Sequence, residues 1–123
     1  MRVAVTTFHG AVSPLFDTAR RLLLADVEPG TVRHVAEEVT DHEDFGEQLR
    51  LLSHYHAAAL ICGAIGAFYR RVLRERGIEV HAWVSTGVDE ALELLALRLA
   101  HAEQPAGGAR VGVVVRGGQD LGA

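Results

Sequence analysis

Two short loops contain the residues of this sequence that are best suited to chemistry. One follows the apolar run Ala57–Ile61 and reads Cys62-Gly63-Ala64-Ile65-Gly66, and the other follows Val3–Val5 and includes Val12-Ser13-Pro14-Leu15-Phe16. A buried strand that breaks at small residues and then starts a helix leaves backbone N–H groups facing a crevice, where α/β proteins bind anionic ligands. Because we expect both loops at the same edge of one sheet, the sequence predicts one binding site between them.

Cys62 and His9 are the predicted metal ligands. Cys62 stands at a strand end, where the N-terminus of the following helix would lower the pKa of its thiol and favour the thiolate that binds iron. His9 lies in the first loop and would add an imidazole, and this pair of ligands suits iron or zinc. The alternative interpretations are a small buried cysteine and an exposed loop histidine.

The glycine-bearing segment Gly63, Ala64, Ile65 and Gly66 is predicted to bind a cofactor through its backbone N–H groups. Ser13 would donate a further hydrogen bond into the site. The segment lacks the Lys-Ser/Thr pair of a P-loop, so nucleotide hydrolysis is unsupported. The alternatives are a tight turn that needs small residues and a serine that only shapes the turn before Pro14.

Periodicity predicts the strands and helices that must position these loops. Val3–Thr7, a central strand Arg20–Glu28 and an edge strand Val32–Val39 come first, and Pro29-Gly30 favours a type II turn that joins the last two as a hairpin. The spacing of Thr40 and Glu43 is typical of a capping box before a helix. The apolar stripe of that helix is Phe45, Leu49 and Leu52.

The second half of the chain alternates strands with helices. The predicted order is a strand at Ala57–Ile61, a helix at Gly66–Arg76 with Phe68, Val72 and Leu73 inward, a strand at Ile78–Val84, and a last helix that begins near Thr86. This order predicts an α/β, ribonuclease-H-like three-layer fold with a mixed five-stranded sheet and about three helices. The first three strands would be antiparallel and the later strands parallel.

The chain divides into a predicted cofactor-binding-like domain at 1–102 and a tail at 103–123. Within the tail, Gln104–Ala109 is a Pro/Gly linker. The segment Arg110–Arg116 is predicted either to add a strand to the sheet or to pair with another copy of the chain as a homodimer.

Composition excludes several classes of protein. The net charge of −4 over 123 residues argues against a nucleic-acid binder, which would usually be basic. A single cysteine permits no internal disulfide and fits a reducing compartment. No apolar run approaches the ~18 residues of a membrane span. We therefore expect a cytoplasmic protein with no membrane partner.

The sequence resembles the dinitrogenase iron–molybdenum cofactor biosynthesis family, which includes nitrogenase cofactor carrier domains. The resemblance rests on Val12-Ser13-Pro14-x-Phe16, Ile61-Cys62-Gly63-x-Ile65-Gly66 and Gly77-Ile78-x-Val80, in that order, and covers about 1–102. It implies a non-enzymatic protein that binds an iron–sulfur or iron–molybdenum cluster, or a precursor. The implied partners are other proteins of metallocofactor assembly, in the context of nitrogen fixation.

Two positions depart from the family pattern, and one of them is Asp17, which stands where relatives have a glycine. Relatives have Ser/Gly-x-His-Phe-Gly in the first loop, and Leu15 stands here at the position of that histidine, the favoured cluster ligand. His9 is the candidate to replace it. The alternative function is a cluster-free interaction module that has kept the fold. A two-metal nuclease is disfavoured, because Asp17, Asp26 and Asp89 are not expected to converge.

Overall fold

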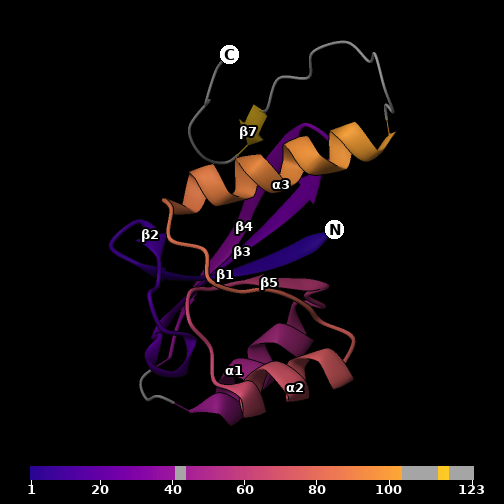
Figure 1. The fold of residues 1–123 in the computed structure, drawn as a ribbon. Coiled ribbons are helices and arrows are strands. Elements are labelled where there is room, and N and C mark those ends of the chain that lie inside the picture. The colour runs from indigo at the N-terminus through magenta and orange to yellow at the C-terminus, as the bar shows by residue number, and fades with distance from the viewer. Residues whose placement is uncertain (41–43, 104–113, 117–123) are drawn as a thin grey trace.

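The protein has three layers, with α3 on one face of a mixed sheet and α1 and α2 on the other (Figure 1). The computed structural model describes residues 1–40, 44–103 and 114–116. The predicted fold class is confirmed. None of the helices in these ranges is long and apolar enough to cross a membrane.

The strands lie in the order β6-β5-β1-β3-β4-β7, and the short β2 pairs with β1. The elements, in chain order, are β1 Arg2–Phe8, β2 Ala11–Val12, a 3-10 helix η1 Phe16–Thr18, β3 Arg21–Glu28, β4 Thr31–Val39, α1 Phe45–His54, β5 Ala59–Ile61, α2 Ala67–Glu75, β6 Glu79–His81, α3 Val88–Glu103 and β7 Val114–Arg116.

The predicted division of the sheet into an antiparallel and a parallel half is confirmed. β1 pairs antiparallel with β3, and β3 with β4, whereas β1, β5 and β6 run parallel. Gly30 adopts a φ of 71° between β3 and β4, which the second central position of a type II turn requires. Parallel β1 and β5 therefore end at the same edge of the sheet, where both loops begin.

The tail supplies one strand to the same sheet. β7 pairs parallel with the first residues of β4, with Val32 opposite Val115. The sequence predicted β4 as an edge strand. In the structure β7 covers its first residues, so β4 is a free edge over only part of its length. The predicted linker Gln104–Ala109 lies outside the described residues.

Two apolar clusters hold the layers together. Alternate residues of the strands pack either against α3, as Val3, Val5 and Val27 do, or against α1 and α2, as Ala4, Leu24 and Leu60 do. Each central strand is thus buried on both faces, which explains its nearly continuous apolar sequence.

Two details of the helices differ from the sequence prediction. Helix α1 is capped by Asp44, whose carboxylate accepts from the N–H groups of Gly46 and Glu47, and not by a capping box at Thr40. Residues 41–43 lie outside the described residues. On α2, Phe68 is 57% exposed instead of inward, and Tyr69 packs against the core in its place.

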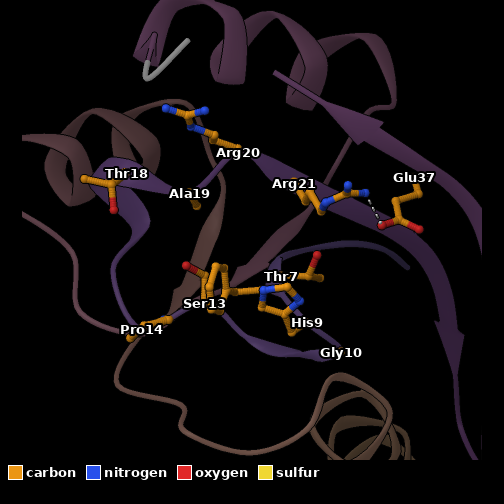
Figure 2. A pocket seen from close by; sticks show the side chains of 11 residues that line it. Thr7, His9, Gly10, Ser13, Pro14, Thr18, Ala19, Arg20, Arg21 and Glu37 are labelled. Carbon is orange, nitrogen blue, oxygen red and sulfur yellow. Dashed lines mark ion pairs between the residues drawn. The ribbon is translucent and has the colours of Figure 1, made fainter. Parts of the chain in front are cut away.

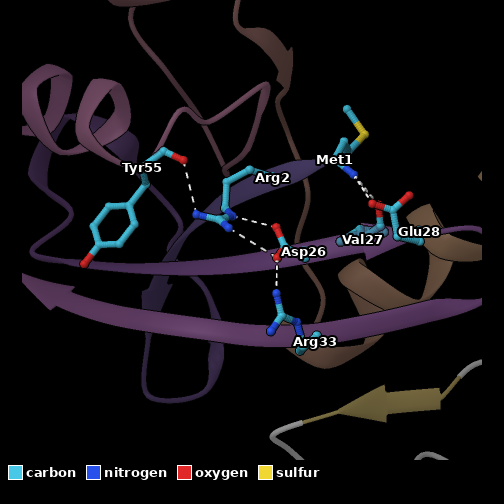
Figure 3. Close-up of polar contacts among 7 residues, drawn as sticks. All are labelled: Met1, Arg2, Asp26, Val27, Glu28, Arg33 and Tyr55. Atoms are coloured by element: carbon cyan, nitrogen blue, oxygen red, sulfur yellow. Dashed lines mark hydrogen bonds and ion pairs between the residues drawn. The ribbon is translucent and has the colours of Figure 1, made fainter.

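A polar network closes the edge of the sheet opposite the loops (Figure 3). Arg2 and Arg33 both donate to the carboxylate of Asp26, each at 2.6 Å. Arg2 also donates to the carbonyl oxygen of Tyr55, so the network ties β1, β3 and β4 to the segment between α1 and β5. It fixes the start of β1 relative to its neighbours.

Candidate functional site

The two loops predicted to flank a site lie at one edge of the sheet and are hydrogen-bonded to each other. Gly63 N–H donates to the carbonyl oxygen of Ser13 at 3.1 Å and Ala64 N–H to that of Pro14 at 2.9 Å, while Phe16 N–H donates to the carbonyl oxygen of Ala64 at 2.8 Å. The predicted shared edge is confirmed. The loops are nevertheless joined side by side and leave no crevice between these atoms.

The expected N–H cradle is therefore not formed. The N–H groups of Gly63 and Ala64 are used within the protein, and that of Gly66 donates to Asp17 Oδ1 at 3.1 Å. Small residues serve here to bring two backbone segments together. Ile65 packs against the core on the α1 and α2 side.

Cys62 is fully buried beneath these loops. Its side chain is 0% exposed and belongs to the cluster that includes Phe16 and Leu73. Burial raises the pKa of the Cys62 thiol to about 11. The predicted lowering of this pKa by the helix N-terminus is wrong, because loss of hydration of the thiolate outweighs the favourable charge of Arg70.

An open pocket of about 520 Å³ lies beside the first loop and contains two of the predicted site residues (Figure 2). His9 and Ser13 line it from the β1–β2 region and the loop, and Thr7 lines it from β1. Cys62 and the segment Gly63–Gly66 are not among its lining residues. The structure thus separates the two predicted metal ligands, placing His9 in a pocket and Cys62 in the core.

A tight hairpin positions His9. Phe8 pairs with Ala11, so His9 and Gly10 form a two-residue turn, and their φ values of 50° and 79° are those of a type I′ turn. The His9 ring stacks edge-on against Phe8, with 4.3 Å between ring centroids. The imidazole therefore stands on an exposed but ordered turn.

The start of α3 holds this hairpin from behind. Val12 N–H donates to the carbonyl oxygen of Thr86 at 3.0 Å, and Val88 N–H donates to that of Gly10 at 3.0 Å. These two hydrogen bonds fix the position of the β1–β2 hairpin relative to α3. The backbone that carries His9 is therefore held in place from both β1 and α3.

Charged residues that the sequence analysis did not select complete the pocket. Arg20, Arg21 and Glu37 line it, and the Arg21 guanidinium lies 3.5 Å from the Glu37 carboxylate. In Figure 2, Arg21 points toward Glu37, whereas Arg20 points to the other side. One signal in the sequence could have identified these residues. The doublet Arg20-Arg21 stands at the start of a predicted central strand, near the sheet edge where both loops begin.

This arrangement can bind an anion but is not a closed metal site. The described residues contain no group of three or more His, Cys, Asp or Glu placed to hold a metal ion. Two guanidinium groups and one carboxylate leave the lining positive, in a chain whose net charge is −4. One imidazole is available as a ligand at the same place.

Comparisons with known proteins agree with this fold. Residues 1–97 match the sequence model of the family described as dinitrogenase iron-molybdenum cofactor. The structure of PH0822 superposes with a TM-score of 0.71 at 21% identity, over 78% of this chain and 88% of that one. No curated protein matches the sequence.

Two further solved structures are similar. A protein provisionally named a dinitrogenase, from Methanocaldococcus jannaschii, gives a TM-score of 0.63 at 18% identity, over 80% of this chain and 90% of that one. A protein provisionally named NifB, from Thermotoga, gives 0.58 at 23% identity, over 80% and 89%. At these identities the likeness concerns the fold.

Proposed function

The chain belongs to the dinitrogenase iron–molybdenum cofactor family, and we propose that it binds and carries an iron–sulfur or iron–molybdenum cluster, or a precursor, without turnover. The observation that carries this proposal is the positive pocket of about 520 Å³ with His9 on its wall. That volume lies within the ~300–1,000 Å³ typical of ligand sites. The donor and acceptor of the cargo would be other proteins of metallocofactor assembly.

The cargo would arrive preassembled. Ordinary iron–sulfur clusters are held by several cysteine thiolates, and this chain has one cysteine, which is buried. A cluster whose terminal metal positions are already filled by other ligands needs fewer protein ligands. Weak retention through one imidazole and surrounding charge suits a carrier that must release its cargo.

We assign the direct ligand to His9. Leu15 cannot ligate iron, and its position in the family pattern lies next to Pro14, which lines the same pocket as His9. Cys62 was the second predicted ligand. It would reach a cluster only after the hydrogen-bonded loops part, because its side chain is fully buried between them and the core.

The test is retention of a cluster by protein purified and loaded without oxygen. Iron and sulfide content and the visible spectrum are measured for the unmodified chain, His9→Asn and His54→Asn. Asparagine tolerates positive φ, so His9→Asn keeps the turn while removing the imidazole. His54 is an exposed histidine on α1 and serves as the matched control.

We expect stoichiometric iron in the unmodified chain and in His54→Asn, and iron loss of about tenfold in His9→Asn. Protein that takes up no iron under any loading condition would overturn the carrier proposal. Equal retention by all three would remove His9 from the site. Adding Cys62→Ala to the series tests the second predicted ligand in the same assay.

One observation favours the alternative of a cluster-free interaction module. The Trp83 residue is 72% exposed and has a φ of 65°. Its backbone N–H donates to the carbonyl oxygen of Gly63 at 2.9 Å. Leu15, which is also exposed, forms an isolated β-bridge with Ala64, the residue after Gly63. Exposed apolar side chains at one edge are typical of protein contacts. Metal-free protein with an intact fold would favour this function.

A further inference from the structure

The edge of the sheet at β6 carries an inference that goes beyond the proposed function and is independent of any cargo. We propose that two copies of the chain pair antiparallel along β6, about a two-fold axis at Val80, and so extend the sheet into a dimer. Such an interface uses the same surface of both copies, so the assembly closes at two. Three features of this edge support a second copy as the partner.

The first feature is the direction of the backbone groups. Within the described residues, β6 ends the sheet and pairs only with β5. Glu79 N–H donates to the carbonyl oxygen of Ala58 at 3.0 Å, and Cys62 N–H donates to that of His81 at 3.0 Å. Because successive residues of a strand direct their backbone groups to opposite sides, the N–H and carbonyl oxygen of Val80 point away from the sheet. They can exchange two hydrogen bonds with the same groups of a second copy.

The second feature is an imidazole nitrogen without a hydrogen-bond partner. The Nε2 atom of His81 is buried, and no described residue forms a hydrogen bond with it, although Glu79 Oε1 lies 3.2 Å away. Residues two apart on one strand stand side by side, about 6.5 Å apart along the chain. This arrangement brings the two side chains close but does not align them.

Antiparallel pairing at Val80 supplies the missing partner. The register places Glu79 of each copy directly opposite His81 of the other, in the kind of pair whose α-carbons lie about 4.5 Å apart. The Glu79 side chain is 64% exposed, so it can turn from its own strand to the second copy. The two-fold axis repeats this exchange, and each imidazole gains the carboxylate of the other copy. Cross-strand pairs of this kind stabilise a sheet.

The third feature is exposed apolar surface beside the same edge. Trp83, two residues after β6, is 72% exposed, and Leu94 of α3 is 47% exposed and lines a small groove with His81. The proposed register brings Trp83 next to Gly77 of the second copy. A β-carbon at Gly77 would have no atom within 4 Å, so there is room for an indole ring. The edge therefore offers apolar contact as well as hydrogen bonds.

The experiment measures the mass of the full, metal-free chain by analytical ultracentrifugation from about 1 to 200 µM, because small interfaces give weak association. The edge variants are Glu79→Lys, which places two basic side chains opposite each other, and His81→Glu, which places two carboxylates opposite each other. Glu93→Lys is the matched control. It lies one turn after Asp89, which contacts His34 of β4 on the side of α3 away from β6. Circular dichroism verifies that each variant is folded.

We expect the unmodified chain and Glu93→Lys to dimerise as the concentration rises, and each edge variant alone to dimerise at least tenfold more weakly. An equimolar mixture of Glu79→Lys and His81→Glu should recover the dimer. Both cross-strand pairs of the mixed dimer then join a basic side chain to a carboxylate. A pair within one chain cannot produce this recovery.

The single tryptophan gives a second measurement. Its fluorescence emission should shift to shorter wavelength as the dimer forms, because the second copy covers the indole of Trp83. A dimer that forms without this shift would overturn the placement of Trp83 in the interface.

An unmodified chain that stays monomeric over the whole concentration range would overturn the dimer. A dimer that persists in both edge variants, or a mixture that does not recover it, would overturn the pairing at Val80. Cluster retention is measured separately, on His9→Asn, so failure of the dimer leaves the carrier proposal standing and failure of the carrier proposal leaves the dimer standing.

Discussion

The backbone of Gly63 lies directly against the carbonyl oxygen of Ser13, to which its own N–H donates at 3.1 Å. A β-carbon at position 63 would lie 2.5 Å from that oxygen and 2.5 Å from the carbonyl oxygen of Pro14. Both are backbone atoms, which cannot turn aside as a side chain can. The contact therefore requires glycine, and it joins the two loops that begin at the ends of β1 and β5.

Replacing Gly63 with alanine should destabilise the protein. The added methyl group would force the two loops apart at the cost of overpacking, about 1–3 kcal/mol. Urea unfolding followed by circular dichroism measures the free energy of unfolding. Gly87→Ala is the matched control, because the nearest atom to its β-carbon would be 3.9 Å away. We expect that control to change stability by less than about 0.5 kcal/mol; equal effects of both substitutions would contradict the close-contact argument.

Asp26 should contribute stability that depends on pH. Its hydrogen bond from Arg2, assisted by Arg33, holds the pKa of the Asp26 carboxyl below its ordinary value. Folding then favours the ionised form, so the contribution is present above the unfolded pKa of about 3.9 and is lost as the pH falls through the lower folded pKa.

Asp26→Asn should accordingly cost about 1 kcal/mol at pH 7, since the pair is partly exposed. The difference from the unmodified chain should shrink below about pH 4. The measurement is the free energy of unfolding from pH 2.5 to 7. Glu47→Gln, which removes a long 3.8 Å contact with exposed Arg50, should have almost no effect at any pH. A difference for Asp26→Asn that stays constant over this range would rule out the proposed linkage.

Cys62 should be unreactive in the folded protein. Burial raises the pKa of its thiol to about 11 and leaves the side chain 0% exposed. At pH 8 the thiolate is scarce and inaccessible, so alkylation by iodoacetamide should be at least ~100-fold slower than in urea. Mass spectrometry follows the single modification. Reaction at similar rates in both conditions would mean that the loops above Cys62 open readily.

Removing the tail should change how the protein associates. β7 covers Thr31–Arg33 at the outer side of β4, and an uncovered strand edge is prone to pair with another chain. A chain that ends at residue 103 should show a mass that rises with concentration in analytical ultracentrifugation. We propose that 1–102 nevertheless folds as the binding unit, so the truncated chain should keep its circular dichroism spectrum.

A point substitution in β7 tests the same role in the full chain. Val115→Pro, which removes one backbone N–H of the strand, should reproduce part of the association. An unchanged mass would assign no protective role to β7.

Sequence patterns predicted the elements well where local chemistry decides them. The turn at Pro29-Gly30 and the alternation of strands with helices after residue 57 both follow from turn propensity and periodicity, which act over a few residues. They also placed both loops at one edge, because parallel strands that alternate with helices end on the same side. The start of α1 was harder, since Thr40 and Asp44 are both good caps and only the fold selects between them.

The sequence by itself therefore determined the layered fold, the family and the meeting of the two loops at one edge of the sheet. Only the tertiary structure decided what each site residue can do, because that depends on neighbours distant along the chain. Cys62 has a high pKa because the core removes water from its thiol. The N–H groups of Gly63 and Ala64 are unavailable to a ligand because they donate to the carbonyl oxygens of Ser13 and Pro14, fifty residues earlier in the chain. Arg21 and Glu37 lie in adjacent strands, and only the fold brings this pair beside His9 in the lining of one pocket.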